Sequence, residues 1–495
     1  MTRLSLNQLD QLPGTLAAPG YSPTRRKVGI VHLGIGNFHR AHQAVYVDDL
    51  LAKTDGHWRI LGVSLRSGSM RDKMMEQDFL YTLREQDEHI QRLRVIGAIA
   101  DVLVAPENPS AVIEAMASPD VHMVSLTVTE KGYYLQAASR QLDLQHADIQ
   151  SDITGGQAPI TIYGFLLAAC RLRMQRQLPG FNVLSCDNLP DNSHLLGQAL
   201  IAAARLQDTD LAHWIERELA FCNTMVDRIV PATTRDDQLA ISEQCDMEDS
   251  GSLSAETYRQ WVIENNFKGE YPDFSQVGAL LVDNVAPYET MKLRLLNGCH
   301  SALAYLGALR GHDTIHQAIT DPVLRTFVSY LMNKELAPTL SPLPGVNLLQ
   351  YQATIVQRFA NHRVPYRCHQ VASDGSQKLP QRLLAAATEL KRKGQSANGI
   401  ACVVGAWLAF LIGSNNQSNY SVNDPGAERL LKMIEQHKKK TDYPNTDQVN
   451  ALLTHSGIVP ATLLADSEWM HKVLVAVQAL LSNTSDKLLS QLTHA

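Results

Sequence analysis

The stretch Lys27-Val-Gly-Ile-Val-His-Leu-Gly-Ile-Gly-Asn-Phe-His-Arg40 joins a short apolar run to a glycine turn and then to a segment compatible with a helix. Such a run, rich in Val, Ile and Leu, is typical of a strand that is buried on both faces of a parallel sheet. Gly34 and Gly36 follow it directly. A turn without Cβ atoms lets backbone N–H groups approach a pyrophosphate at a helix N-terminus. The stretch therefore predicts the strand, turn and helix that open a dinucleotide-binding fold.

Two parts of the usual dinucleotide-binding pattern are missing. His39 stands where a third glycine is expected. The next apolar run, Trp58–Leu65, predicts the second strand, but the stretch from Gly56 to Arg71 contains no Asp or Glu to bind the ribose hydroxyls. Arg66 and Ser67 stand there instead. Because an acid at this point would repel a 2′-phosphate, its absence leaves NADP possible beside NAD.

Alternation of strand-like and helix-like segments continues along the first half of the chain. Further apolar runs are Leu93–Ile99, Val121–Val128 and Phe181–Cys186, and helix-compatible stretches are Ala41–Ala52, Met70–Gln77, Ala111–Met116 and Tyr163–Arg176. This alternation predicts a doubly wound α/β domain. From about Val285 helical patterns follow one another, with Ile400–Ile412 the most apolar. We expect an α/β protein with a Rossmann-type N-terminal domain, residues 1–285, and a mainly α-helical C-terminal domain, residues 286–495.

Composition excludes several classes of protein. The chain has 495 residues, 45% of them apolar, and a net charge of −6, which argues against a disordered chain and against a nucleic-acid binder. Its longest uncharged apolar run has thirteen residues, whereas a membrane span needs about twenty. The N-terminal segment lacks the apolar region of a secretory signal. Seven scattered cysteines without a C-x-x-C pair resemble reduced thiols. We expect a cytoplasmic protein with no nucleic-acid or membrane partner.

Lys292, Asn297 and His300 interrupt the apolar pattern of one predicted helix. Asn297 and His300 share a face, and Lys292 lies about 80° round the axis from His300 at roughly 100° per residue. Oxidising an alcohol requires a base for the hydroxyl proton and donors for the developing alkoxide. A desolvated Lys can be that base, and Asn and His can donate. The alternative, a solvated Lys beside an Asn–His pair that serves the backbone, stays open.

Histidines near the first turn do not form a recognisable metal site. His32, His39 and His42 have no nearby Cys, Asp or Glu that would complete tetrahedral ligation, so we predict no metal. Other polar segments follow predicted strands, where ligands of open α/β sheets bind. These segments are Thr127–Gly132, Ser185–Pro190 and Met225–Pro231.

Taken together, the motifs resemble the mannitol dehydrogenase family, the polyol-specific long-chain dehydrogenases, over nearly the whole chain. The motifs are Gly34–Gln43, Ser125–Gly132, Ser185–Asn188, Met225–Ile229, Lys292-x4-Asn297-x2-His300 and Asp374–Pro380. The resemblance implies an active site between the two domains. It also implies hydride transfer, without a metal, between NAD or NADP and a secondary alcohol of a polyol or sugar acid. It assigns no role to Asp374–Pro380, and because long members of the family are often monomers, a monomer is expected.

The resemblance also implies roles for catalytic residues. Matched to the family pattern, Lys292 is the general base, and Asn188 and Asn297 form a hole for the developing oxyanion. His300 holds the substrate oxygen. Glu289 lies on the path by which the Lys292 proton reaches water.

Binding residues follow from the same resemblance. Asp227 contributes to substrate binding, together with Asn188 and His300. The residues matched to cofactor binding are Gly34, Ile35, Gly36, Asn37, Phe38, Arg66 and Ser67.

Two branches of the family compete for this chain. One interconverts mannitol and fructose, and the other interconverts mannonate and fructuronate. Gly62–Arg66, Gln77–Leu83, Thr161–Phe165 and Asp187–Pro190 look more like the mannitol branch, and Met225–Pro231 more like the other. The balance favours mannitol and fructose. A catalytically silent sugar-binding protein is the alternative from another class, and the presence of the Lys and both Asn residues argues against it.

Overall fold

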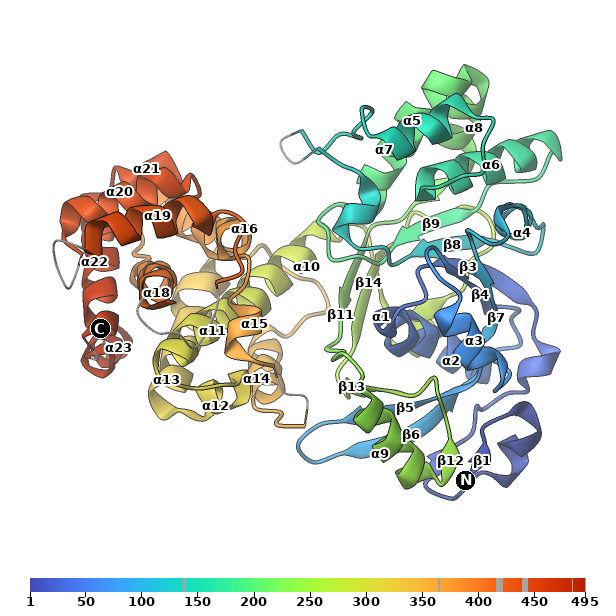
Figure 1. Ribbon diagram of the computed structural model, residues 1–495, viewed down its shortest axis with the longest axis horizontal. Helices are drawn as coiled ribbons and strands as arrows, with labels where there is room; N and C mark the ends of the chain where they lie inside the picture. The colour runs from blue at the N-terminus through green and yellow to red at the C-terminus, as the bar shows by residue number, and fades with distance from the viewer. Residues whose placement is uncertain (137–138, 364–365, 415–421, 439–443, 483, 495) are drawn as a thin grey trace. The chain divides into compact units, whose positions relative to one another are not determined.

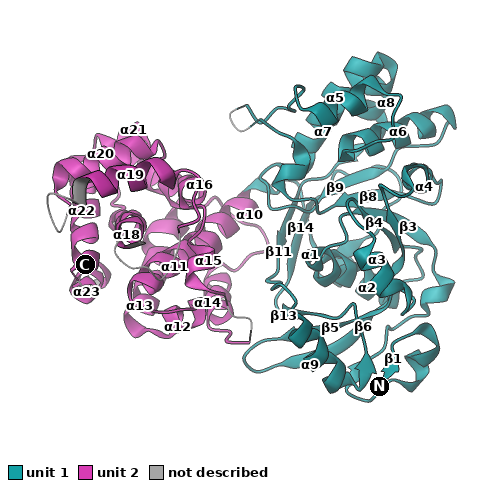
Figure 2. Ribbon diagram, viewed as in Figure 1, with its two compact units in different colours: residues 1–286 teal, residues 287–495 magenta. Residues whose placement is uncertain are grey.

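The structure, a computed structural model, describes residues 1–495 except 137–138, 364–365, 415–421, 439–443, 483 and 495. It divides into two compact units, Met1–Ala286 and Pro287–Ala495 (Figure 2). Unit 1 combines sheets and helices, whereas the described part of unit 2 is helical (Figure 1).

The central sheet of unit 1 has six parallel strands. They are β3 (Val28–Leu33), β4 (Arg59–Ser64), β7 (Ile99–Val104), β8 (Met123–Leu126), β9 (Asn182–Ser185) and β10 (Ala220–Phe221). Their spatial order is β10-β9-β8-β3-β4-β7. The chain thus runs from β3 to one edge, returns, and runs from β8 to the other edge. This is the doubly wound order, and its switch point lies between β3 and β8, so the predicted Rossmann-type fold is confirmed.

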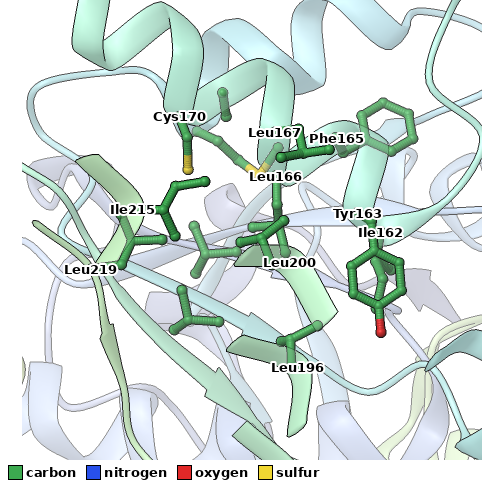
Figure 3. Close-up of a cluster of buried hydrophobic side chains, with 14 of the residues drawn as sticks. Ile162, Tyr163, Phe165, Leu166, Leu167, Cys170, Leu196, Leu200, Ile215 and Leu219 are labelled. Carbon is green, nitrogen blue, oxygen red and sulfur yellow. The ribbon is translucent and has the colours of Figure 1, made fainter. Parts of the chain in front are cut away.

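Both faces of this sheet are buried, which explains the continuous apolar runs. Val31 and Leu33 belong to one buried cluster, and Ile30 belongs to another. Figure 3 shows part of the first cluster. It is covered by α4 (Pro109–Met116), α6 (Ile162–Gln175), α7 (Asn192–Gln207) and α8 (Thr209–Glu218). The second cluster includes α2 (Gln43–Lys53). Each fully buried Leu or Ile contributes roughly 1.5–3 kcal/mol, so burial on both faces fixes the sheet.

One predicted strand lies outside the central sheet. The run Leu93–Ile99 mostly belongs to β6 (Gln91–Ile96), which pairs antiparallel with β5 (Tyr81–Gln86) and parallel with β2 (Leu16–Ala17) in a smaller sheet. The third strand of the central sheet is instead β7. Since β7 lies at the edge, it carries an exposed charged residue, Asp101, and does not form a continuous apolar run.

Smaller sheets complete unit 1. Their orders are β13-β5-β6-β2, β11-β14-β15 and β1-β12. The strands are β1 (Thr2–Arg3), β2 (Leu16–Ala17), β11 (Thr224–Asp227), β12 (Met247–Glu248), β13 (Leu253–Glu256), β14 (Gln260–Glu264) and β15 (Leu280–Val282). The other α-helices are α1 (Asn37–Ala41), α3 (Ser69–Met75), α5 (Ala147–Thr154) and α9 (Arg235–Cys245).

Unit 2 is built around α18 (Asn398–Ser414), whose segment Ile400–Ile412 is buried as predicted. α18 packs against α11 (Cys299–Leu309) and α22 (Ser467–Leu481). The remaining helices are α10 (Ala286–Met291), α12 (Ile315–Thr320), α13 (Pro322–Tyr330), α14 (Leu348–Phe359), α15 (Cys368–Val371), α16 (Gly375–Leu379), α17 (Ala385–Arg392), α19 (Ala427–Lys438), α20 (Thr446–Ser456), α21 (Ala461–Leu464) and α23 (Ser485–His494). Among the described helices, none combines the length and apolar character that crossing a membrane requires.

Three segments of unit 2 are π-helical: Lys292–Gly298, Leu331–Leu336 and Pro380–Leu384. The first packs against both of the others. A π-helix accommodates i→i+5 hydrogen bonds and is found often at functional sites.

Candidate functional site

The glycine turn after β3 is fixed by contacts with the loop after β8. Gly34 has φ +100°, and a Cβ there would lie 2.0 Å from the Thr127 carbonyl oxygen. The Gly34 N–H donates to the Val63 carbonyl at 2.9 Å. The Thr127 hydroxyl donates to the Gly34 carbonyl at 2.7 Å. Only glycine fits this position, and the turn lies at the switch point between β3 and β8, where ligands of such sheets bind.

The residues after Gly34 play different structural parts. Gly36 is exposed, and a Cβ on it would meet nothing within 4 Å. Ile35 is buried and packs over Gly62, where an added Cβ would lie 2.6 Å from the Ile35 Cδ1 atom. Asn37 and Phe38 begin α1, and the Phe38 ring stacks on His42 at 5.1 Å. The protein itself leaves the space at Gly36 open, which suits close approach of a ligand to the backbone.

His39, in place of the third glycine, is buried under the turn. Its ring stacks on His32 with centroids 3.5 Å apart. His32 hydrogen-bonds through Nδ1 to the Ser125 hydroxyl at 2.7 Å and through Nε2 to the Thr127 hydroxyl at 2.9 Å. Burial lowers the pKa of His32 to about 3, so the ring is neutral. These histidines support the turn. In the described part of the chain no group of three or more His, Cys, Asp or Glu side chains is arranged to hold a metal ion.

Arg66 and Ser67 lie just beyond β4 and are exposed. The Ser64 hydroxyl donates to the Ser67 carbonyl at 2.6 Å, which fixes the chain after the strand. Since β3 and β4 are adjacent and parallel, their carboxyl ends meet at one edge of the sheet. The structure therefore brings the predicted cofactor residues of both segments to the same edge.

Asp187 links the loops that follow β8 and β9. Its carboxylate accepts hydrogen bonds from the backbone N–H groups of Val128 and Thr129, both at 2.9 Å, and from the Tyr133 hydroxyl at 2.7 Å. Burial raises the pKa of Asp187 above its usual range. The neighbouring residue Asn188 is exposed. Sequence reasoning placed Asp187 within a motif without a role, and the structure shows that it holds the backbone beside Asn188.

Asp227 ends β11 in one of the smaller sheets, where it pairs in register with Gln260. It is 3% exposed. Asn188 and Asp227 thus both belong to unit 1, whereas Glu289, Lys292 and His300 belong to unit 2.

The helical geometry predicted around Lys292 was wrong in one respect. Glu289 lies on α10, and His300 lies on α11, but Lys292 and Asn297 lie between them in a π-helical segment. The angle of 100° per residue holds only for an α-helix, so the expected offset of 80° between Lys292 and His300 does not apply. The segment is tightly packed at Gly298, where a Cβ would lie 3.1 Å from the Leu383 Cδ2 atom.

His300 presents a buried ring nitrogen that has no hydrogen-bond partner among the described residues. Its ring stacks on Phe359 at 5.2 Å and meets the edge of Tyr366 at 5.5 Å. Its Nε2 atom is buried and has no hydrogen-bond partner among the described residues. Burial, reinforced by neighbouring cations, lowers the pKa of His300 to about 3. A buried polar atom usually has a partner, so this neutral nitrogen is a candidate for binding a ligand oxygen.

Arg382 is a residue of this site that sequence reasoning missed. It lies in the π-helical segment Pro380–Leu384 and donates to the Asn297 carbonyl at 3.3 Å and to the Ser301 hydroxyl at 2.9 Å. Burial lowers its pKa to about 10. The guanidinium therefore ties the Asn297 backbone to a second segment of unit 2. The available signal was a lone Arg two residues after the Asp374–Pro380 motif.

The fold and the glycine turn at its switch point define a dinucleotide-dependent dehydrogenase of the Rossmann type. Residues 28–276 match the family model of the mannitol dehydrogenase Rossmann domain, and residues 284–481 match that of the mannitol dehydrogenase C-terminal domain. The chain belongs to the mannitol dehydrogenase family, as its motifs indicated, and is an oxidoreductase that acts on CH–OH groups.

Relatives cover most of the chain. It is 41% identical over 471 residues to the D-mannonate oxidoreductase of Escherichia coli K12, covering 94% of this chain and 96% of that protein. It is 39% identical over 435 residues to a mannitol 2-dehydrogenase of Phaeosphaeria nodorum, covering 86% and 76%.

Solved structures show the same architecture. The Pseudomonas fluorescens mannitol 2-dehydrogenase, in ternary complex with NAD and D-mannitol, is 34% identical with a TM-score of 0.84 and covers 99% of both chains. A substrate-free D-sorbitol dehydrogenase is 30% identical with a TM-score of 0.89 and covers 98% of this chain and 99% of its own.

Two glycines of the turn provide a matched test. We expect Gly34→Ala to lower the free energy of unfolding by roughly 2–5 kcal/mol, because it combines a strained φ with steric overlap. Gly36→Ala should change it by less than about 0.5 kcal/mol, because its surroundings are open. Denaturant unfolding of both variants measures the difference. Equal stability of the two variants would contradict the geometry described for the turn.

Proposed function

We propose that the protein transfers hydride reversibly between NAD and a secondary alcohol of a six-carbon polyol, with mannitol and fructose as the substrate pair. The observation that carries the proposal is the neutral Nε2 atom of His300, which has no hydrogen-bond partner in the described part of the chain. His300 lies on the same helical run as Lys292 and Asn297. Within this chain it provides a prepared donor or acceptor for a substrate oxygen. The likeness to a mannitol 2-dehydrogenase complexed with NAD and D-mannitol supports the choice of cofactor and substrate.

The residues of unit 1 fit a dinucleotide. Gly34 holds the turn in place, and the open space at Gly36 admits a pyrophosphate close to the backbone of Asn37 and Phe38. Arg66 and Ser67 border the adenosine ribose. When bound, NAD supplies the hydride acceptor.

Lys292 is the proposed general base. In the oxidation direction the substrate carbon loses a hydride to the nicotinamide, and its hydroxyl proton passes to the Lys292 Nζ atom. Glu289 lies three residues before Lys292, within α10, and passes the proton on to water. No metal takes part in this scheme.

Asn188, Asn297 and His300 are the proposed donors to the developing alkoxide. Amide N–H groups stabilise negative charge on oxygen without titrating themselves. The low pKa of His300 keeps its ring neutral at physiological pH, so its hydrogen bonding does not change there. Asp227 binds another hydroxyl of the substrate.

Mannonate and fructuronate are the second candidate pair, because cations surround His300. The charges of Arg382, Arg358 and Lys378 all act to lower its pKa. One of them, Lys378, also lies 3.7 Å from the Asp374 carboxylate. A positive field at this end of unit 2 favours a substrate with a carboxylate, and the identity to a D-mannonate oxidoreductase agrees.

The decisive experiment compares fructose and fructuronate as oxidants of NADH, followed by its absorbance. A kcat/KM for fructose above that for fructuronate supports the mannitol pair, and the reverse supports the mannonate pair. No turnover with either substrate, in a protein that binds NADH, would favour the silent sugar-binding alternative. We also propose a cytoplasmic location and a monomer.

Substitution of Lys292 tests its proposed role as the general base. We expect Lys292→Ala to lower the rate of alcohol oxidation by about 10²–10⁴-fold, because a positioned base contributes this much, while the Kd for NADH stays the same. Lys334→Ala is the matched control, since Lys334 is an exposed cation on another π-helical segment of unit 2. A Lys292→Ala rate close to the control at neutral pH would remove Lys292 from this role.

The two asparagines should act as one unit. We expect Asn188→Ala and Asn297→Ala each to lower kcat by roughly 10²–10³-fold, as the loss of an oxyanion donor does. The double variant should lose less than the product of the single losses, because both donate to one oxygen. Steady-state kinetics of the parent, the two single variants and the double variant give this comparison. Strictly multiplicative losses of kcat would show that the two amides do not donate to the same oxygen.

Cofactor choice depends on the end of β4. We expect Ser67→Asp to raise the preference for NAD over NADP at least tenfold, about 1.4 kcal/mol, because a carboxylate binds the ribose hydroxyls and repels a 2′-phosphate. The ratio of kcat/KM values for the two cofactors measures this preference. An unchanged ratio would show that residue 67 does not face the ribose.

A further inference from the structure

Asn192, the first residue of α7, is a buried amide whose hydrogen-bonding groups are all used. Its Nδ2 group donates to the carbonyl oxygens of Asp187 at 3.0 Å and Thr224 at 2.9 Å. Its Oδ1 atom accepts from the backbone N–H groups of Thr224 at 3.1 Å and Ser193 at 2.8 Å. An amide side chain has two N–H donors and two acceptor lone pairs, so the backbone around Asn192 satisfies all four.

These bonds connect two segments that carry proposed substrate residues. Asp187 directly precedes Asn188, and Thr224 begins β11, which ends at Asp227. Strands β9 and β11 belong to different sheets, so no backbone ladder joins them among the described strands. The side chain of Asn192 makes to Thr224 both bonds that a residue of a neighbouring strand would make. One amide therefore takes the place of a ladder between the loop after β9 and β11.

The peptide unit that joins Asp187 to Asn188 is held from two sides. Its carbonyl oxygen accepts from the Asn192 side chain and from the Leu189 N–H, the latter at 2.9 Å. The Asp187 carboxylate binds two backbone N–H groups of the loop after β8. Because a peptide unit is planar, fixing its carbonyl also fixes the point from which the Asn188 side chain leaves the backbone.

Asn223 makes the reverse connection, from the residue before β11 to α7. Its Oδ1 atom accepts from the N–H groups of Ser193 at 3.0 Å and His194 at 3.1 Å, in the first turn of the helix. Its Nδ2 group donates to the Asp191 carboxylate at 2.8 Å. The side chain of Asp191, the N-cap residue, makes no capping bond to this described helix, so Asn223 satisfies N–H groups that a helix leaves open at its start.

We propose that Asn192 is a positioning residue for the reaction, which holds Asn188 at a fixed place relative to Asp227. The proposal rests on the proposed function, because it takes Asn188 as a donor to the alkoxide and Asp227 as the partner of another hydroxyl. Asn192 itself does not touch the substrate. A donor is effective only when it points to the place where charge develops, and a misplacement of about 1 Å can lower a rate by roughly 10²-fold.

A second buried asparagine provides a matched control. Asn182 begins β9, at the end of the strand opposite to the Asn188 loop, and like Asn192 it is 0% exposed. Its Nδ2 group donates to the carbonyls of His122 at 3.2 Å and Lys268 at 3.0 Å, and its Oδ1 atom accepts from the Lys268 N–H at 2.8 Å. Asn192→Asp and Asn182→Asp keep the shape of the side chain and replace the NH₂ group by an oxygen. Asn192→Ser, which keeps one donor and one acceptor, is a milder second variant.

We expect both Asp variants to lower the midpoint of denaturant unfolding, because each loses bonds to backbone carbonyls. Only the two variants at Asn192 should lower kcat for the polyol, Asn192→Asp by about tenfold to a hundredfold. The Kd for NADH should change no more than in Asn182→Asp. In an Asn188→Ala background, Asn192→Asp should lower kcat by much less than in the parent, because its effect passes through Asn188. Hydrogen exchange of residues 186–191, followed by mass spectrometry, should be faster in Asn192→Asp than in Asn182→Asp.

Three results would overturn the proposal. If Asn192→Asp and Asn182→Asp lower kcat equally, the amide at residue 192 only stabilises the fold. If the losses of kcat from Asn192→Asp and Asn188→Ala multiply, Asn192 does not act through Asn188. If the exchange of residues 186–191 does not change, Asn192 does not hold this loop. An Asn188→Ala variant with the kcat of the parent would instead reject the proposed function of Asn188, and the exchange comparison would still decide whether Asn192 holds the loop.

Discussion

The close approach of Gly34 to the Thr127 carbonyl is the constraint on which unit 1 depends. Strands β3 and β8 are neighbours in space but far apart in sequence, and the chain leaves them toward opposite edges of the sheet. The positive φ at Gly34 lets the turn after β3 bend away from the loop after β8. The Gly34 carbonyl still accepts a hydrogen bond from the Thr127 hydroxyl. A side chain at Gly34 would push the two loops apart. The ligand-binding edge of the sheet therefore relies on one missing Cβ atom.

The sequence predicted those parts of the fold in which local pattern and burial agree. Strands β3, β4, β8 and β9 were found because burial on both faces requires continuous apolar residues. The edge strand β7 was missed because its exposed Asp101 is compatible with an edge but interrupts such a run. The β6 run was found but assigned to the central sheet, and its antiparallel partner β5 was missed because Arg84, Glu85 and Gln86 interrupt its apolar character. Patterns of hydrophobicity do not separate a strand of one sheet from a strand of another.

For the candidate site, residue types were more predictable than geometry. The glycine turn and the Lys292, Asn297 and His300 set are visible as local departures from an apolar pattern. The π-helical path between them is not, because it coincides with contacts that Gly298 makes with a segment some eighty residues later. Arg382 was missed because a lone Arg in a helical pattern resembles a surface cation. Its partner atoms, a backbone carbonyl and a serine hydroxyl, leave no mark in the sequence.

The π-helical segment also limits how this gene can vary in length. A π-turn accommodates one more residue than the α-turn it replaces. Deleting a single residue between Lys292 and Gly298 would let the segment relax to an α-turn with the following helix still in phase. Deleting a second residue would turn everything after it by roughly 100° about the axis. The ring of His300 would then leave its stack on Phe359. We therefore expect a deletion of two residues in this short segment to be more damaging than a deletion of one.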